Sequence, residues 1–436
     1  MFYSTFIDPY TLLLKDKSIS KDIKIFSFLL FLIPIALVTG PAAPDIILSI
    51  IAFYFFIKSI FHKLWNYYHN PIVYGFLLFS LYGILRSLFS DMPIESLTNE
   101  GSIFYFRYIF FAMGVWYLLN QNAYLSKCLL YIILICVFFI GIGSYLQYLL
   151  GFSLLGFEKV SANRLSLGLT NEPHVGRYLT FLAIFAFALI YRSFKISKKI
   201  LLLSITFLIF IEIVIFLSGE RSAFFYFLFF SILILIYIPD FKIYRLIGFL
   251  ISLIIIFFII NINPTAKERM IDYTLDQISE TKIPVLPYSE SHERHYIVSF
   301  KMFKSNPIFG VGTNTFRFKC DKEIFYYKKN SCTTHPHNFY IQLLAELGLL
   351  GFFFISSFFG YLVYYGIRQL YFLLMLKKNK LIPFEHFLFF IVIFVFWWPL
   401  ITHMSFYNNW NNVLMMLPLG YLLKYLYNNK ISKWKL

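Results

Sequence analysis

Residues 334–351 read THPHNFYIQLLAELGLLG and change within a few positions from a polar, histidine-bearing start to an apolar helix of the kind that crosses a membrane. An imidazole with an unperturbed pKa near ~6.5 can take or give a proton at neutral pH, so His335 and His337 are candidates for proton transfer. The alternative is that both histidines only anchor and cap the helix. The remainder of the chain decides between these interpretations.

Apolar stretches of this kind recur along nearly the whole chain. Of its 436 residues, 59% are hydrophobic, 22% are aromatic and only 14% are charged. About twelve runs of roughly 17 to 22 residues match the length that a helix needs to cross about 30 Å of hydrocarbon. The sequence therefore predicts an all-α polytopic membrane protein with about twelve transmembrane helices. The runs lie near residues 25–40, 43–60, 71–89, 102–119, 128–150, 173–191, 200–218, 222–238, 246–262, 343–366, 383–402 and 412–427.

Basic residues predict the orientation of these spans. Segments 15–24, 191–199, 375–380 and 428–436 are rich in Lys and Arg, and with twelve spans all of them fall on one side. Because cytoplasmic loops carry an excess of Lys and Arg, we expect this side and both termini to be cytoplasmic. The formal net charge of +16 is then explained by membrane topology, and no nucleic-acid partner is expected.

The predicted spans divide the chain into three parts. Residues 1–261 hold the first nine spans, residues 262–342 form one large outer loop, and residues 343–436 hold the last three spans and a cytoplasmic tail. The outer loop is the only segment long enough to fold over the membrane surface, so it is the natural place for a catalytic or substrate-binding element. His335 and His337 lie at its end.

Two of the four cysteines lie in this outer loop. Cys320 and Cys332 can form a disulfide that closes a short loop, or they can remain free thiols. Cys128 and Cys136 lie inside the fifth predicted span. Neither pair has the CxxC spacing of a redox or zinc site.

Four arginines are not explained by the cytoplasmic excess of positive charge. Arg86, Arg107, Arg177 and Arg221 all fall at the outer ends of predicted spans. Since a charge at the centre of a membrane helix costs roughly 2.5 to 3.5 kcal/mol, such residues usually face a partner or a wet cavity. One arginine alone can simply reach a lipid phosphate. Four at one depth predict a pocket for a phosphate or pyrophosphate on a lipid, because the guanidinium fork matches phosphate oxygens.

Arg221 stands in SGERSAFF (218–225), where two spans meet with almost no loop. Ser222 and Ala223 are small enough to let the backbone approach a neighbour or a ligand. Glu220 can also pair with Arg221 in a purely structural ion pair.

Arg294 stands in SHERHYIVSFKMFKSNPIFGVGTNTF (291–316) of the outer loop. Apolar residues at 296, 297, 300 and 303 have helical spacing and predict an amphipathic helix lying on the membrane, which the Pro and Gly residues of NPIFGVG end. Taken alone, Arg294 can also be an ordinary surface residue.

Together, SGERSAFF, ERHY followed by NPIFGVGTNTF, and HPHNFYIQLLAELGLLG resemble the bacterial O-antigen ligase family. The resemblance in topology covers the whole chain, and its specific motifs lie between residues 218 and 351. It implies a fold like that of GT-C type glycosyltransferases and an active site at the periplasmic face of the inner membrane. It also implies transfer of a glycan from undecaprenyl pyrophosphate to a hydroxyl of lipid A-core oligosaccharide, with inversion and without a metal or other cofactor.

The resemblance also assigns roles to residues. Arg221 and Arg294 match two hallmark arginines that stabilise the departing pyrophosphate, and His337 matches the histidine that acts as general base, a role worth about 100- to 10,000-fold in rate. Thr334 is the expected N-cap, which would place His337 in the first helical turn. We expect the substrates to be bound by Arg86, Arg107, Arg177, His335 and Asn338, with membrane lipids as further partners.

Three other functions stay open at this point. An O-antigen or capsule polymerase would use the same donor, and a protein O-oligosaccharyltransferase of this kind would usually be longer. A transporter for lipid-linked sugars is the alternative from another class, although the arginines cluster at one face and no internal repeat is visible. The chain contains no HExxH, phosphate-binding glycine loop, DxD or GxSxG motif, which disfavours metal-dependent glycosyl transfer.

Overall fold

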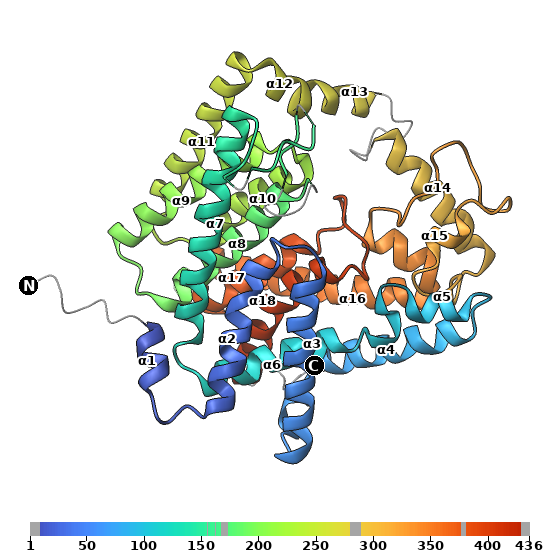
Figure 1. The fold of residues 1–436 in the computed structure, drawn as a ribbon, viewed down its shortest axis with the longest axis horizontal. Coiled ribbons are helices and arrows are strands. Elements are labelled where there is room, and N and C mark those ends of the chain that lie inside the picture. Colours follow the sequence, from blue (N-terminus) through green and yellow to red (C-terminus); the bar gives the residue numbers. More distant parts are fainter. Residues whose placement is uncertain are drawn as a thin grey trace, which may run out of the picture.

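The protein is a bundle of helices joined by loops (Figure 1). The computed structural model describes residues 9–154, 156–161, 163–166, 173–279, 289–375 and 381–428, and no strand occurs among them. The helices before the outer loop are α1 (Pro9–Lys15), α2 (Lys21–Ala36), α3 (Ala42–Phe61), η1 (Trp65–Tyr67), α4 (Pro71–Leu88), α5 (Pro93–Thr98), η2 (Asn99–Phe104), α6 (Arg107–Gln121), α7 (Leu125–Leu150), α8 (Val175–Ser193), α9 (Lys198–Leu217), α10 (Arg221–Tyr237) and α11 (Lys242–Ile262). The later ones are α12 (Pro264–Lys267), η3 (Glu268–Asp272), α13 (Tyr273–Ser279), α14 (Glu290–Ser305), α15 (Phe316–Lys319), α16 (Phe339–Met375), α17 (Phe384–Phe396) and α18 (Asn409–Asn428).

Each of the twelve predicted ranges contains a helix, which confirms an all-α, multi-pass membrane protein. Within the described residues, eight helical segments are long and apolar enough to cross a membrane: α3, α4, η2 with α6, α7, α8, α9, α11 and α16. The apolar helices α10 and α17 are shorter. Since α2 and α18 occupy the two remaining ranges, a total of twelve crossings stays a prediction.

Helix α8 lies at the centre of the bundle. It packs against α7, α9, α10 and α17, and every residue from 178 to 191 is buried. A second centre forms where α6 packs against α3 and α18. By contrast, α3, α4 and α11 expose large apolar side chains, including Phe53, Leu78 and Phe257, as helices that face lipid are expected to do.

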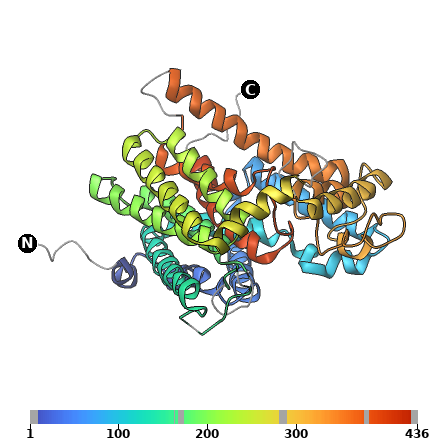
Figure 2. The ribbon, with the colours of Figure 1, turned by 90° about the horizontal axis from the view of Figure 1, so that it is seen from above.

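Helix α16 is broken near its start. Gly348 has a φ of +63° and its Cα lies against the carbonyl of Ile308, so no side chain fits at this position. The loop after α14 fills the break, since the N–H of Gly312 donates to the carbonyl of Glu346 (2.9 Å) and the N–H of Leu349 to that of Pro307 (2.9 Å). The part of α16 beyond the break runs along one edge of the molecule (Figure 2).

The outer loop holds α12, η3 and α13 at the end of the molecule opposite α1, with α14 and α15 beside α16 (Figure 1). The helix predicted around Arg294 is confirmed as α14, and it ends at Ser305 before NPIFGVG. Helix α14 packs against α16 through another face and leaves Phe300 50% exposed, so contact of its apolar face with the membrane stays a prediction. The buried residues are His295, Val298, Ser299 and Met302.

Candidate functional site

The polar segment before α16 is a loop and not the first turn of the helix. The helix begins at Phe339, and Asn338 is its cap, since its Oδ1 accepts the N–H groups of Tyr340 (3.0 Å) and Ile341 (3.2 Å). The prediction that Thr334 caps the helix is therefore wrong. The amide of Asn338 also donates to the carbonyl of Pro399 (2.8 Å), so this side chain anchors the loop.

His337 lies just outside the helix, with its backbone in the left-handed region at φ +59°. Its carbonyl accepts the N–H of His403 (2.8 Å), which ties this loop to the segment between α17 and α18. A non-glycine residue with positive φ is uncommon and is kept only where the surroundings hold it. These contacts hold the imidazole of His337 at the junction of α16 and the outer loop.

Four imidazole rings gather at this junction. The ring centroid of His337 lies 4.2 Å from that of His335, 5.4 Å from that of His292 and 5.7 Å from that of His295. His292 and His295 belong to α14, so the cluster joins the outer helix to the start of α16. No group of three or more His, Cys, Asp or Glu among the described residues is arranged to hold a metal ion.

The histidine cluster is neutral at pH 7. The pKa of His337 is lowered to about 4, chiefly by burial and in addition by the neighbouring His295 and Arg177, while a hydrogen bond with the backbone of His403 opposes the change. Burial also lowers the pKa of His292 to about 4, with His337, His295 and Arg221 adding to the effect. A neutral imidazole has a free lone pair, so His337 is in the form that accepts a proton.

Two of the four outer arginines belong to this site. Arg177, in the first turn of α8, is close enough to lower the pKa values of both His335 and His337. Arg221, the first residue of α10, acts on His292 in the same way and donates to Thr274 (3.2 Å) and Gln277 (2.8 Å) of α13. The structure thus brings a proton acceptor and two guanidinium groups together.

The other two arginines are bound to protein groups, and the structure does not bring them together with Arg177 and Arg221. Arg86 donates to the carbonyls of Gly310 (2.7 Å) and Phe89 (2.8 Å), so it fixes the loop that fills the break in α16. Arg107 forms an ion pair with Asp45 (2.9 Å) and also donates to the side chain of Asn409. The sequence showed only that Arg86 and Arg107 lie at the same end of their predicted spans. Such a position does not reveal which group the side chain binds.

Arg294 is also held by neighbours. Its guanidinium forms an ion pair with Glu290 (2.7 Å), one turn earlier on α14, and donates to the carbonyl of Lys329 (3.0 Å). It thereby fastens the 328–331 segment to α14, and the same segment accepts a bond from His295 through the carbonyl of Ser331 (3.1 Å). The charge of Arg294 also lowers the pKa of His295, so Arg294 lies near the histidine cluster.

Glu220 bonds to backbone and not to Arg221. Its carboxylate accepts the N–H groups of Gly176 (2.5 Å) and Arg177 (3.3 Å), so it caps the start of α8. Burial raises the pKa of Glu220 to about 7, against the opposing effects of the Arg177 and Arg164 charges and of these N–H groups. The interpretation of Glu220 as an ion-pair partner of Arg221 is therefore replaced by a capping role.

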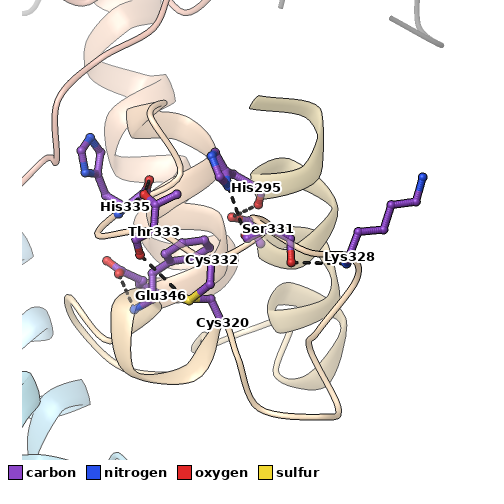
Figure 3. Close-up of a disulfide and its surroundings, with 10 residues drawn as sticks. His295, Cys320, Lys328, Ser331, Cys332, Thr333, His335 and Glu346 are labelled. Carbon is purple, nitrogen blue, oxygen red and sulfur yellow. Dashed lines mark hydrogen bonds between the residues drawn. A yellow bond between two sulfur atoms is a disulfide. The ribbon is translucent and has the colours of Figure 1, made fainter. Parts of the chain in front are cut away.

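A disulfide stabilises the segment that carries His335. Cys320 and Cys332 are bridged, with Cα atoms 5.0 Å apart. Thr333, next along the chain, donates through its hydroxyl to the carbonyl of His335 (3.0 Å). Figure 3 shows the bridge beside α14, with His335 projecting away from it.

Sequence reasoning missed four residues of the site: Arg164, Arg269, His292 and His295. The two histidines stand three positions apart in SHERHY, a spacing that puts them on one helical face and could have drawn attention to them. Arg164 and Arg269 lie in outer segments where charged residues are ordinary, and no sequence signal distinguishes them.

Comparison with known families supports this assembly. A family model described as O-antigen ligase matches residues 204–356. This part of the chain is therefore similar to the O-antigen ligase family. The predicted resemblance is confirmed over α9 to the first half of α16, a segment that includes Arg221, Arg294 and His337. No curated protein matches the chain. The matched family is one of enzymes related to glycosyl transfer.

Proposed function

We propose that this protein is an O-antigen ligase of the bacterial inner membrane. It transfers a glycan from undecaprenyl pyrophosphate to a hydroxyl of lipid A-core oligosaccharide at the periplasmic face. The observation that carries the proposal is the position of neutral His337 beside Arg177, at the junction of the outer loop and α16. A proton acceptor next to fixed positive charge is what transfer from a pyrophosphate requires.

The reaction needs one proton acceptor and one stabilised leaving group. The acceptor hydroxyl gives its proton to the imidazole of His337 while its oxygen bonds to the anomeric carbon of the donor sugar. The bond from that carbon to the phosphate oxygen breaks, and its electron pair stays on the pyrophosphate. Attack from the side opposite the leaving group inverts the anomeric centre, and the donor brings its own leaving group, so no other energy source is needed.

The arginines act on the charge that develops. Arg177 and Arg221 present planar guanidinium donors to the phosphate oxygens. Their interaction strengthens as the pyrophosphate gains charge, which lowers the barrier to transfer. In the proposal Arg221 exchanges its bonds to Thr274 and Gln277 for bonds to the donor.

Binding of the donor also improves the base. A pKa of about 4 makes His337 a weak base in the empty site, because burial and nearby positive charges disfavour the imidazolium. A pyrophosphate bound beside Arg177 offsets those charges and raises the pKa of His337 toward the working pH. The base therefore becomes effective only when the donor is present.

Arg294 and His335 support the site in this proposal without touching the reacting atoms. Arg294 fastens the 328–331 segment to α14, and the bridged segment holds His335 against His337. The resemblance makes Arg294 a hallmark residue, and in this proposal its role is to position the histidine cluster.

A transfer assay tests the function. Purified protein in detergent receives undecaprenyl-pyrophosphate glycan and lipid A-core, with a chelator and without ATP, and is compared with His337→Ala and with His62→Ala. His62 is exposed at the end of α3 and serves as the matched control. We expect glycan on lipid A-core with the wild type and His62→Ala, and a loss of about 100- to 10,000-fold with His337→Ala.

Two other outcomes of this assay would identify a different function. A lengthened lipid-linked glycan, with lipid A-core unmodified, would identify a polymerase. Absence of both products from a folded protein that moves the lipid-linked sugar across a vesicle membrane would identify a transporter.

A further inference from the structure

Gly219 is the point at which three outer segments meet. It joins α9 to α10 with a φ of +74°, and its Cα lies against the carbonyl of Asn163, so no side chain fits there. The N–H of Leu165 donates to the carbonyl of Ser218 (3.3 Å), and Nε of Arg269 donates to that of Gly219 (3.1 Å). The loop after α7, the α9–α10 junction and η3 are therefore fastened together.

This junction brings Arg164, Arg221 and Arg269 into one another's fields, and Arg177 acts with Arg164 on the same carboxylate, that of Glu220. Arg164, Arg221 and Arg269 come from the three joined segments, and Arg177 comes from α8. Burial lowers the pKa of Arg269, and the charges of Arg221 and Arg164 lower it further. The charges of Arg177 and Arg164 both act on Glu220, whose carboxylate is already occupied by the backbone N–H groups that cap α8.

One buried guanidinium donor of this cluster has no partner, and a second is weakly bonded. Nε of Arg164 is buried without a hydrogen-bond partner, and its Nη2 reaches the carbonyl of Pro173 only at 3.5 Å. A buried donor without a partner costs free energy, more so on a charged group, so an anion bound here would be stabilised. The charges also repel one another, and Glu220 carries at most one negative charge to offset them.

We propose that Arg164 and Arg269 complete a diphosphate-binding site with Arg177 and Arg221. Arg164 and Arg177 lie outside the matched O-antigen ligase segment of residues 204–356. The two phosphate groups of a lipid-linked diphosphate offer enough oxygens to accept from several guanidinium forks at once. An excess of positive charge also suits the product, because the diphosphate gains a negative charge when the glycosyl bond breaks.

This inference rests on the proposed function for the identity of the leaving group, but it is tested by binding alone. The full chain in detergent is titrated with inorganic pyrophosphate at fixed low salt, and the affinity is compared among the wild type, Arg164→Gln, Arg269→Gln and Arg368→Gln. Arg368 lies in the distal part of α16, is bonded to the hydroxyl of Tyr364, and is the matched control.

We expect Arg164→Gln and Arg269→Gln each to weaken pyrophosphate binding by about 10- to 100-fold, while Arg368→Gln binds as the wild type does. Arg164→Lys and Arg269→Lys keep the charge without the fork, and we expect them to recover part of the affinity. The lysine variants also guard against misfolding, since the fold then keeps its charge balance.

Each remaining outcome separates the site from the function. Unchanged affinity in both glutamine variants, or no binding by the wild type, overturns the diphosphate site even where glycan transfer is normal. Weakened binding in both variants of a protein that transfers no glycan supports the site and overturns the proposed ligase activity.

Discussion

The rings of His337 and His292 lie 5.4 Å apart at an angle of 89°, although the two residues come from the start of α16 and from the outer helix α14. Burial lowers the pKa of both imidazoles and keeps both rings neutral at pH 7. A proton on either ring would place a positive charge beside the other. The contact therefore joins the outer loop to the bundle through uncharged rings and is sensitive to acid.

Acid should destabilise this contact. The folded pKa values of His337 and His292 are about 4, below the ordinary value near ~6.5, so between these values the unfolded chain binds protons that the folded chain does not. Stability then rises with pH across this window and falls as pH is lowered through it. We expect the thermal midpoint in detergent to drop between pH 6.5 and 4, as checked by scanning fluorimetry.

A variant of His292 tests whether its ring contributes to that pH dependence. His292→Gln should flatten the slope of the thermal midpoint against pH, whereas His62→Gln, at an exposed position, should leave the slope as it is in the wild type. An equal slope in His292→Gln and wild type would show that acid acts elsewhere.

Glu220→Gln should tighten anion binding. The amide oxygen of glutamine can still accept an N–H group at the start of α8, so the cap is partly kept, while above the Glu220 pKa of about 7 one negative charge leaves the arginine cluster. We expect pyrophosphate to bind several-fold more tightly to this variant, measured by titration at low salt. Glu220→Ala, which removes the cap as well, should lower the thermal midpoint. Weaker binding by Glu220→Gln would mean that the carboxylate orients the arginines.

The helices were predictable from sequence and the partners of charged residues were not. Long apolar runs can satisfy their backbone groups in lipid only as helices, so all twelve ranges contain one. Arg107 pairs with Asp45, which stands 62 positions earlier, and no local pattern records such a contact. The same holds for Arg164 and Arg269, which approach Arg221 only because Gly219 lets their segments touch.

The loop before α16 shows a second limit. Thr334 and Asn338 are both good N-caps by residue type. Asn338 holds the position because its amide also reaches the carbonyl of Pro399, a contact that depends on the later fold. The sequence predicts His337 at the start of the apolar helix. In the structure His337 lies just before that helix, but it is in a loop with positive φ.

Arg86→Gln should reduce stability without changing anion affinity. Three carbonyl groups accept from the guanidinium of Arg86, and two of them belong to the loop that fills the break in α16. Since hydrogen bonds to charged groups contribute on the order of 1.5 to 3 kcal/mol, we expect a clearly lower thermal midpoint than for Arg368→Gln. Pyrophosphate titration of the same preparation should give the wild-type affinity. A normal midpoint with weakened binding would return Arg86 to the donor site.

Reduction of the Cys320–Cys332 bridge should lower both stability and transfer. The bridge closes a short loop, and a cross-link over a loop of this length contributes about 3 kcal/mol, chiefly by restricting the unfolded chain. It also fixes the segment in which Ser331 binds His295 and Thr333 binds the carbonyl of His335, so its loss loosens the ring cluster around His337. We expect a reductant to lower the thermal midpoint and the transfer rate of the wild type.

The double variant Cys320→Ser and Cys332→Ser should start at those lower values and be insensitive to reductant. Cys128→Ser, which replaces a buried free thiol, is the matched control and should keep the wild-type response. A wild type that is indifferent to reductant, with the bridge shown to be open by mass, would refute a supporting role for the disulfide.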